Sequence, residues 1–236
     1  MKAVLKRSYL RTFAFAKAWG FVKTPTPEAI LKTVTDAKKV LGDALFIGGI
    51  AVGHHGHERT TEDVDILYPN YSEHEFLRAL QKDFKIVIKA ESGWHQLEHR
   101  KTKVRVELIP EGGLGTYGFI PGPKTVGGKD GFISLLGLAW LKLVSARSQD
   151  IADLVNLAQK QMRGMHALTA KLPPELRERF QAVLTQAQFE MDNDPLRRAK
   201  KERDAGSAQE PSPRYGKKVK RAVKKSAPRA RKQRVR

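Results

Sequence analysis

Apolar positions follow two different periods along the first half of the chain. Between positions 30 and 41 they recur every three or four residues, which predicts a helix that begins at Pro27 after Thr26. From 63 to 68 and from 104 to 109 apolar and polar residues alternate, which predicts strands with one buried face. Further strands are predicted over 44–52, 85–89 and 95–99.

The rest of the chain is mostly helical in pattern. Ser72 followed by Glu75 predicts a capped helix to about Lys82. The segment 110–130, which is rich in glycine and proline, predicts a long loop. Helices are then predicted over 132–146, 150–162 and 174–190. Strands that lie close together in the sequence, followed by a helical half, indicate an α+β fold.

Charge is distributed unevenly over the 236 residues. The net charge is +19, and the segment 196–236 contains 17 Lys and Arg against 3 Asp and Glu. This tail therefore carries +14, and the 195 residues before it carry only +5. A segment of this composition cannot bury a core and is predicted to be a disordered basic tail that attracts polyanions such as nucleic acid.

The composition also excludes several classes of protein. The chain has no cysteine, so disulfides and thiolate metal sites are excluded. The longest apolar run, 132–144, contains Lys142 and is too short to span a membrane, and we expect a cytoplasmic protein. The predicted parts are an N-terminal extension, a core, a helical subdomain and the tail, at 1–24, 25–130, 131–195 and 196–236.

Two aspartates and a pair of glycines carry the most informative chemistry. Asp63 and Asp65 lie on one face of a predicted strand, with Cα atoms about 7 Å apart. Two carboxylates at that spacing can bind hard cations such as Mg²⁺ together with substrate phosphates. The upstream pair Gly48-Gly49 has no side chains, so its backbone N–H groups can approach a triphosphate closely.

A third carboxylate is predicted on a later strand. Alternation over 104–109 places Arg105, Glu107 and Ile109 on one face. If this strand pairs beside the one that carries Asp63, then Glu107 completes a cluster that could hold two metal ions. The alternative left open is that Glu107 only pairs with Arg105 or Lys103.

The segment from Gly48-Gly49 through Arg59-x-Thr61-x-Asp63-Val-Asp65-Ile resembles the motif of the DNA polymerase β-like nucleotidyltransferase superfamily. Its Arg-x-Thr-x-Asp-x-Asp form is most similar to the AbiEii-like nucleotidyltransferases of abortive-infection and toxin–antitoxin systems. The resemblance covers roughly residues 28 to 160 and implies a small mixed nucleotidyltransferase sheet flanked by helices. Two positions depart from the motif: Glu107 replaces the more usual Asp, and Ile50 follows the glycines in place of Ser.

The resemblance also implies roles for individual residues. Asp63 and Asp65 would bind the metals, and Gly48-Gly49, Arg59 and Thr61 would contact the nucleotide. Lys142 would contact phosphate, and Asp150 would lie near the nucleotide or act as a base. On the sequence alone, Lys142 could instead be a surface lysine, and Asp150 could instead be the N-cap or a first-turn acid of its helix.

These features predict a nucleotidyltransferase that moves a nucleoside monophosphate from an NTP to an acceptor, with two Mg²⁺ ions and with RNA as one candidate acceptor. The alternative is a catalytically silent domain of the same fold, tethered to nucleic acid by the tail 196–236. The resemblance further suggests an antitoxin protein as a partner. Three histidines at 54, 55 and 57 look like a metal cluster, but zinc sites take ligands from well-spaced elements, so we expect these histidines to be solvated.

Overall fold

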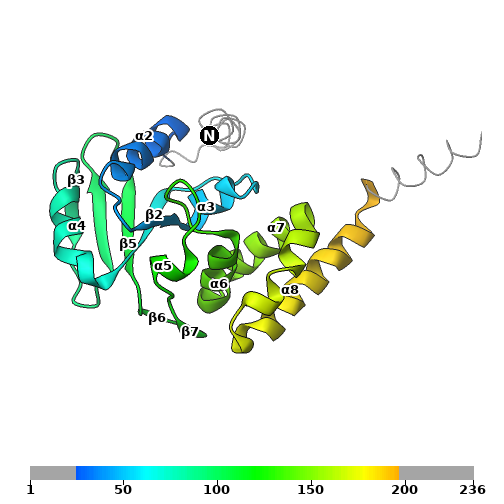
Figure 1. Cartoon of the computed structure of the whole chain (residues 1–236). Coiled ribbons are helices and arrows are strands. Elements are labelled where there is room, and N and C mark those ends of the chain that lie inside the picture. The colour runs from blue at the N-terminus through cyan, green and yellow to red at the C-terminus, as the bar shows by residue number, and fades with distance from the viewer. Residues whose placement is uncertain (1–24, 197–236) are drawn as a thin grey trace, which may run out of the picture. The chain divides into compact units, whose positions relative to one another are not determined.

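The computed structural model describes residues 25–196 and contains a five-stranded mixed sheet in the order β1-β2-β5-β4-β3 (Figure 1). Strands β2 and β5 run parallel, and the other neighbouring strands are antiparallel. The five strands are β1 (Leu45–Ile47), β2 (Asp63–Tyr68), β3 (Phe84–Ile88), β4 (His95–His99) and β5 (Arg105–Pro110). The predicted α+β fold with a small mixed sheet is therefore confirmed.

One face of the sheet is apolar and covered by helices. Its strands contribute fully buried side chains such as Val64, Ile66 and Val106, as the alternation predicted. The helices α2 (Pro27–Lys38) and α4 (Glu73–Leu80) lie on this face. Two polar contacts attach them to β4. The Nε2 atom of His99 lies 3.2 Å from the Oδ2 atom of Asp36 on α2, and the Nε2 atom of His95 lies 3.1 Å from the Oε1 atom of Glu73 on α4.

The predicted caps of these two helices differ in outcome. Thr26 caps α2 as expected, because its hydroxyl accepts a hydrogen bond of 3.1 Å from the Ala29 amide. The prediction of a capping box at Ser72 is wrong. A single turn of 3-10 helix, η1 (Asn70–Ser72), precedes α4, and the Ser72 hydroxyl donates to the Pro69 carbonyl instead of capping.

The long strand predicted over 44–52 is wrong, because only β1 is extended. Gly48 has a left-handed φ of +60°, which ends the strand, and α3 (Gly48–His54) follows directly. This helix buries Ile50, Ala51 and Val52. A short apolar run does not distinguish a buried strand from a buried helix turn.

The predicted loop 110–130 contains structure of its own. It contains a two-stranded sheet, formed by β6 (Leu114–Gly115) and β7 (Gly118–Phe119), and the short helix α5 (Pro123–Val126). The β6–β7 hairpin is attached to the C-terminal end of the following helix. The Tyr117 amide donates to the Val144 carbonyl over 3.0 Å, and the Thr116 hydroxyl donates to the Ser145 carbonyl over 3.1 Å.

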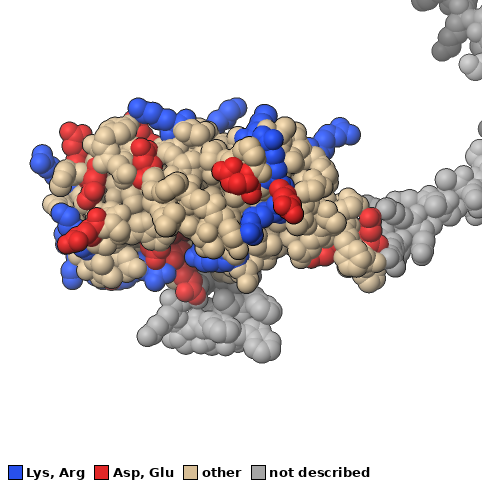
Figure 2. Space-filling view, turned by 90° about the horizontal axis from the view of Figure 1, so that it is seen from below, with Lys and Arg blue, Asp and Glu red and all other residues tan. Residues whose placement is uncertain are grey.

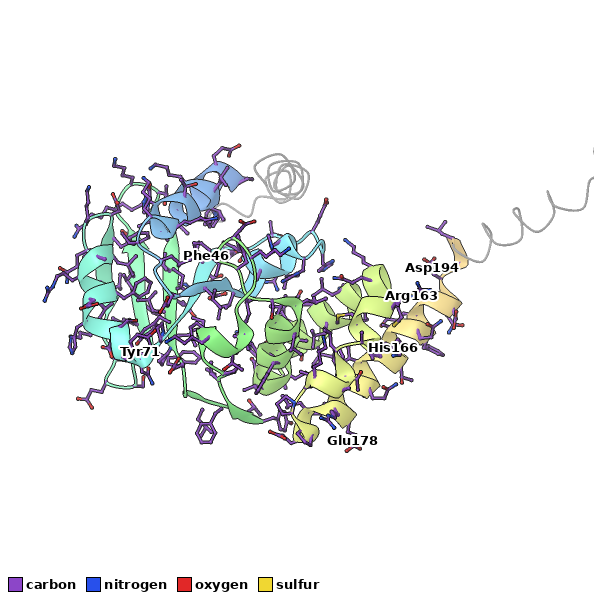
Figure 3. The ribbon with its side chains drawn as sticks, viewed as in Figure 1. Phe46, Tyr71, Arg163, His166, Glu178 and Asp194 are labelled. Carbon is purple, nitrogen blue, oxygen red and sulfur yellow. The ribbon has the colours of Figure 1, made fainter. Side chains whose placement is uncertain are left out.

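The helical half follows as predicted, with shifted boundaries. It consists of α6 (Leu135–Ser145), α7 (Ser148–His166), the 3-10 turn η2 (Thr169–Lys171) and α8 (Pro174–Asn193). Helix α7 has a kink at Gln161, whose φ and ψ are not helical. Figure 3 shows Phe46 of β1 in the interior of the molecule, and Arg163 and His166 near the C-terminal end of α7.

The described residues up to Asp194 belong to one compact unit, so the predicted division at 130/131 stays a prediction. The predicted extension 1–24 and, apart from Leu196, the basic tail lie outside the described residues. Figure 2 shows Lys and Arg interspersed with Asp and Glu on the face it presents. Within residues 25–196, no helix is long and apolar enough to cross a membrane.

Asp36 on α2 is expected to make stability depend on acid pH. The side chain is buried and contacts Lys32, Lys39 and His99, and the hydrogen bonds from the two lysines hold its pKa well below the ordinary value of 3.8. A lowered pKa means that the unfolded chain binds the proton first. The stabilisation is therefore complete above about pH 4 and is lost progressively as the pH falls below 3.8.

Asp36→Asn should lower the free energy of unfolding at pH 7 by about 1–3 kcal/mol, the size of hydrogen bonds to a charged group. Urea denaturation at pH 7 and pH 3 would measure this loss. The difference in the free energy of unfolding between the variant and the unaltered protein should be smaller at pH 3. An equal difference at both pH values would contradict the assignment. Glu28→Gln, an exposed acid on the same helix, is the matched control.

Candidate active site

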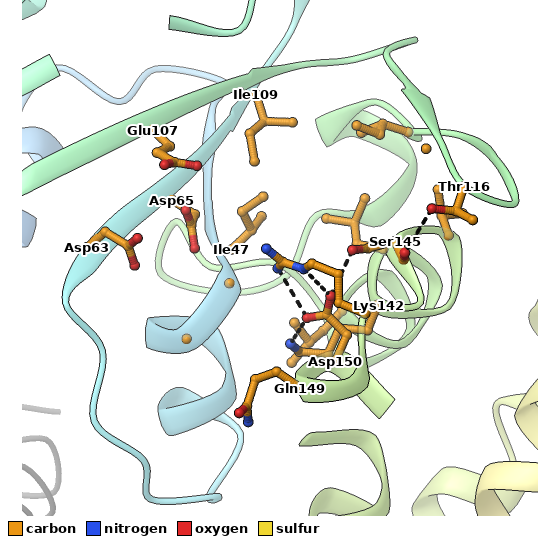
Figure 4. Close-up of a pocket in the computed structure, with 18 of the residues that line it drawn as sticks. Ile47, Asp63, Asp65, Glu107, Ile109, Thr116, Lys142, Ser145, Gln149 and Asp150 are labelled. Atoms are coloured by element: carbon orange, nitrogen blue, oxygen red, sulfur yellow. Dashed lines mark hydrogen bonds and ion pairs between the residues drawn. The ribbon is translucent and has the colours of Figure 1, made fainter. Parts of the chain in front are cut away.

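The second face of the sheet carries the predicted carboxylates side by side. In the parallel pairing of β2 with β5, Asp65 lies opposite Glu107 and Asp63 lies opposite Arg105. Neighbouring strands are about 4.8 Å apart, so Asp65 and Glu107 are adjacent on one face. Figure 4 shows the carboxylates of Asp63, Asp65 and Glu107 close together along the two strands. The three acids therefore lie on one face of two adjacent strands, as the alternation predicted.

These acids line a cleft of about 800 Å³ between the sheet and the helical half. The predicted residues Gly48, Gly49, Arg59, Lys142 and Asp150 line it as well. Thr61 is buried, and its hydroxyl donates to a carboxylate oxygen of Asp63 over 3.2 Å. The nucleotide-binding role predicted for Thr61 stays a prediction, and its observed contact orients Asp63.

The glycine pair has a structural reason that sequence analysis missed. A Cβ atom on Gly48 would lie 1.7 Å from a carboxylate oxygen of Asp65, and one on Gly49 would lie 2.7 Å from the hydroxyl of Thr61. The left-handed φ of Gly48 adds a second requirement for glycine. The pair therefore allows β2 to pack directly against the start of α3, while its backbone lines the cleft.

Like charges gather around Asp65. Burial, followed by the neighbouring charges of Asp63 and Glu107, raises the pKa of Asp65 to about 7. Arg147 and Lys142 act in the opposite direction from across the cleft but do not cancel the effect. A local excess of negative charge of this kind favours the binding of cations.

Arg105 occupies part of the carboxylate cluster. Its ion pair with Glu107 is the alternative that the sequence left open for that acid, whereas Lys103 pairs with Glu98. The Arg105 guanidinium donates to Asp63 over 2.7 Å and lies 3.5 Å from Glu107. Across residues 25–196, no group of three or more His, Asp and Glu side chains is arranged to hold a metal ion. The oxygen ligands fit Mg²⁺, but an ion bound by all three acids would have to displace Arg105 from Asp63.

Replacing Arg105 is expected to strengthen metal binding. Its side chain is half exposed, and an exposed ion pair contributes at most about 1 kcal/mol. Arg105→Gln should therefore tighten the binding of Mn²⁺, measured by electron paramagnetic resonance without nucleotide, by about two- to fivefold. Lys101→Gln removes the same charge from an exposed turn and is the control. An equal affinity in both variants would show that Arg105 does not compete for Asp63.

Lys142 lies inside an ion-pair network instead of at the surface. Its ammonium donates to Asp150 over 2.8 Å and to Asp153 over 2.7 Å, and all three side chains are buried. The surface-lysine alternative is therefore wrong. The phosphate contact predicted for Lys142 stays a prediction, and it would require the ammonium to leave one of the two carboxylates.

The network extends across the cleft. Asp153, which sequence analysis did not select, also pairs with Arg59, and Asp150 accepts hydrogen bonds from Arg147 and Ser145. Burial alone would raise the pKa of Asp150, but Arg147 and Lys142 lower it to about 2. A carboxylate of this pKa is a weak base, so the arrangement does not favour the base role predicted for Asp150.

The histidines near the site are engaged in packing. His54 stacks on Phe132 with ring centroids 4.2 Å apart, and His55 forms a hydrogen bond of 2.9 Å with the Ile133 carbonyl. Burial lowers the pKa of both imidazoles. These contacts attach α3 to the segment before α6, so the prediction that His54 and His55 are solvated is wrong.

Comparisons with solved structures give distant similarities, and two of them are described here. No protein-family model and no curated protein sequence matches the chain. A proposed nucleotidyltransferase from Thermotoga maritima aligns over 39% of this chain with 15% identity and a TM-score of 0.30. The antibiotic-resistance factor ANT(2'')-Ia aligns over 75% of this chain and 96% of its own, with 17% identity and a TM-score of 0.36. The chain spans 62% of the Thermotoga protein. Likenesses of this extent carry no argument about function, which depends on the cleft itself.

Proposed function

We propose that the protein is a metal-dependent nucleotidyltransferase of the polymerase β-like type that transfers a nucleoside monophosphate from an NTP to a hydroxyl of an RNA acceptor. The observation that carries the proposal is the register of β2 and β5. It aligns Asp65 with Glu107, on the same face as Asp63 and against the Gly48 turn. The AbiEii-like pattern from Arg59 to Asp65 supports the same reaction class, and the antitoxin partner stays a prediction.

The charges of the cleft support a requirement for divalent ions. Four carboxylates and four cationic side chains line it, and the cations other than Arg105 pair with Asp150 or Asp153. A triphosphate without accompanying cations would meet the uncompensated charge near Asp65. Asp63, Asp65 and Glu107 would hold two Mg²⁺ ions, which supply charge neutralisation of the reacting phosphate.

Individual residues of the cleft have separate roles in the proposed reaction. The backbone at Gly48-Gly49, with Arg59 beside it, would hold the triphosphate, and Glu107 would accept the proton of the acceptor hydroxyl. The acceptor oxygen forms a bond to the α-phosphorus of the NTP. The bond between that phosphorus and the oxygen that bridges it to the β-phosphorus breaks. Pyrophosphate leaves with the electron pair. Positioning and charge stabilisation provide most of the acceleration in this reaction class.

Incubation with α-labelled NTPs, Mg²⁺ and a short single-stranded RNA tests the proposal. We expect label on the RNA and release of pyrophosphate, and no label when the NTP is labelled at the γ-phosphate. Transfer that persists undiminished in Asp63→Asn would contradict the assigned mechanism.

The second candidate is the catalytically silent binding domain, and the ion pair between Arg105 and Asp63 is the observation that favours it. It predicts no transfer from any NTP to any acceptor, together with RNA binding in a gel shift. Because the tail is expected to supply that binding, removing residues 196–236 should abolish the shift. Binding retained after truncation would assign it to the folded part.

A further inference from the structure

Trp94 places an aromatic ring in the cleft that also contains the carboxylates. It directly precedes β4, whose antiparallel register with β5 pairs His95 with Leu108 and Gln96 with Glu107. Continuing this register by one residue places Trp94 beside Ile109, on the face that carries Glu107. The side chain is 43% exposed and lines the cleft.

The backbone that carries Trp94 is held firmly. The buried Tyr68 hydroxyl donates to the Gly93 carbonyl over 2.7 Å, and Gly93 has a left-handed φ of +81°. A Cβ atom on Gly93 would lie 2.9 Å from the Tyr68 hydroxyl and 3.1 Å from Pro110. The indole nitrogen of Trp94 lies beside Gly113, where a Cβ atom would approach it to 3.2 Å. The backbone before Trp94 and one edge of its ring are therefore in contact with the fold.

The ring of Trp94 has no stacking partner in the part of the chain that the structure describes. Arg179 lies over the ring of Tyr117 and Lys124 lies over the ring of Tyr71, whereas no ring or cation within residues 25–196 stacks on the Trp94 indole. Apolar side chains line the cleft together with it, namely Ile109, Leu114 and Ile120. Figure 2, which looks from the side of β6 and β7 in Figure 1, shows a broad uncharged area on this side.

The strand order places Trp94 opposite the glycine turn. Gly48 follows β1, the carboxylates lie on β2 and β5 in the middle, and Trp94 precedes β4 on the far side. In phosphoryl transfer the attacking and leaving oxygens are roughly in line through the phosphorus. If the leaving pyrophosphate lies at the glycine turn, the attacking hydroxyl comes from the side of β4.

We propose that Trp94 is the stacking platform for the terminal base of a single-stranded RNA acceptor, whose ribose hydroxyl it directs toward Glu107. The inference rests on the proposed function and adds the acceptor subsite to it. Single-stranded RNA ends are bound by stacking of unpaired bases on aromatic side chains, and this stacking tolerates any base. The apolar wall around Trp94 suits a flat base, and the carboxylates of the same cleft disfavour a phosphate at that position.

The same stacking chemistry could come from the base of the donor NTP. The two sources are distinguished by labelling the full-length protein with 5-fluorotryptophan. The chain has three tryptophans, and the fluorine signal of Trp94 is identified by its loss in Trp94→Phe. A single-stranded hexaribonucleotide with a free 3′-hydroxyl is titrated in one arm, and an NTP with Mg²⁺ in the other. Binding of RNA to the basic tail would not by itself move the Trp94 signal.

We expect the hexaribonucleotide to shift the Trp94 signal saturably and the NTP to leave it in place. A shift produced by the NTP and not by RNA would overturn the assignment to the acceptor, and no shift in either arm would overturn the platform itself. Because this binding needs no chemistry, a chain that fails to transfer label could still pass the test, so the two proposals fail separately.

In the transfer assay, Trp94→Ala should raise the KM for RNA by about 5- to 100-fold and leave the KM for the NTP unchanged. Trp94→Phe should keep most of the affinity for RNA, because it retains an aromatic face. A loss of kcat with an unchanged KM for RNA in Trp94→Ala would contradict a role in binding the acceptor.

Discussion

Asp65→Asn is expected to lower the rate of nucleotidyl transfer by at least about 10³-fold. The amide loses the charge that faces Glu107 and Asp63, and metal-based charge stabilisation contributes several kcal/mol in this type of reaction. Label transfer from an α-labelled NTP, measured at saturating Mg²⁺, gives the rate. Glu75→Gln, at an exposed acid of α4 on the other face of the sheet, is the control and should leave the rate nearly unchanged.

The same substitution should not weaken the fold. The pKa of Asp65 is raised to about 7, so the folded state disfavours the ionised carboxylate. As the pH rises from about 4 to 7 the unfolded chain ionises before the folded one, and the native protein loses stability. Asp65→Asn removes this loss, and its melting temperature at pH 8 should be equal or a few degrees higher. An inactive variant that is also strongly destabilised would indicate a structural role for Asp65 instead.

Lys142→Met is expected to destabilise the protein by about 3–5 kcal/mol. The substitution keeps the length of the side chain but leaves Asp150 and Asp153 buried without the ammonium between them. Removing one partner of a buried ion pair typically has this cost, because the other charge stays out of water. Urea denaturation at pH 7 measures the change. Arg147 and Arg59 still contact the two acids, so the lower end of the range is expected.

Two further variants make this prediction specific. Lys171→Met, at an exposed lysine of η2, should change the stability by less than about 0.5 kcal/mol. Adding Asp153→Asn to Lys142→Met should restore part of the lost stability, because the second change removes the buried charge that the first leaves unpaired. Equal destabilisation by the single and double variants would contradict the network.

The periodic strands and helices of the fold could be predicted from the sequence. Val64, Ile66 and Val106 alternate with polar residues, and burial of one sheet face imposes that alternation directly. The same pattern placed Asp65 and Glu107 on the opposite face. The sequence does not determine that these two strands pair, because the register between distant strands depends on the whole sheet.

Other features depend on contacts that no local pattern contains. Gly48 ends β1 through its left-handed φ, and it must be glycine because Asp65, 17 residues away in the sequence, fills the space that a side chain would need. Lys142 is buried because Asp150 and Asp153 on α7 pair with it, and the sequence analysis did not select Asp153. Arg105 was predicted to share a face with Glu107, but its preference for Asp63 follows from the register of β2.

A crystal structure of the full-length protein with a non-hydrolysable NTP analogue and Mn²⁺ is the most direct test of the central claim, because anomalous scattering locates the metal ions. We predict metal peaks in contact with Asp63, Asp65 and Glu107, Arg105 displaced from Asp63, and the triphosphate against Gly48-Gly49. A triphosphate bound elsewhere in the cleft, or metal ions that do not contact Glu107, would contradict the account.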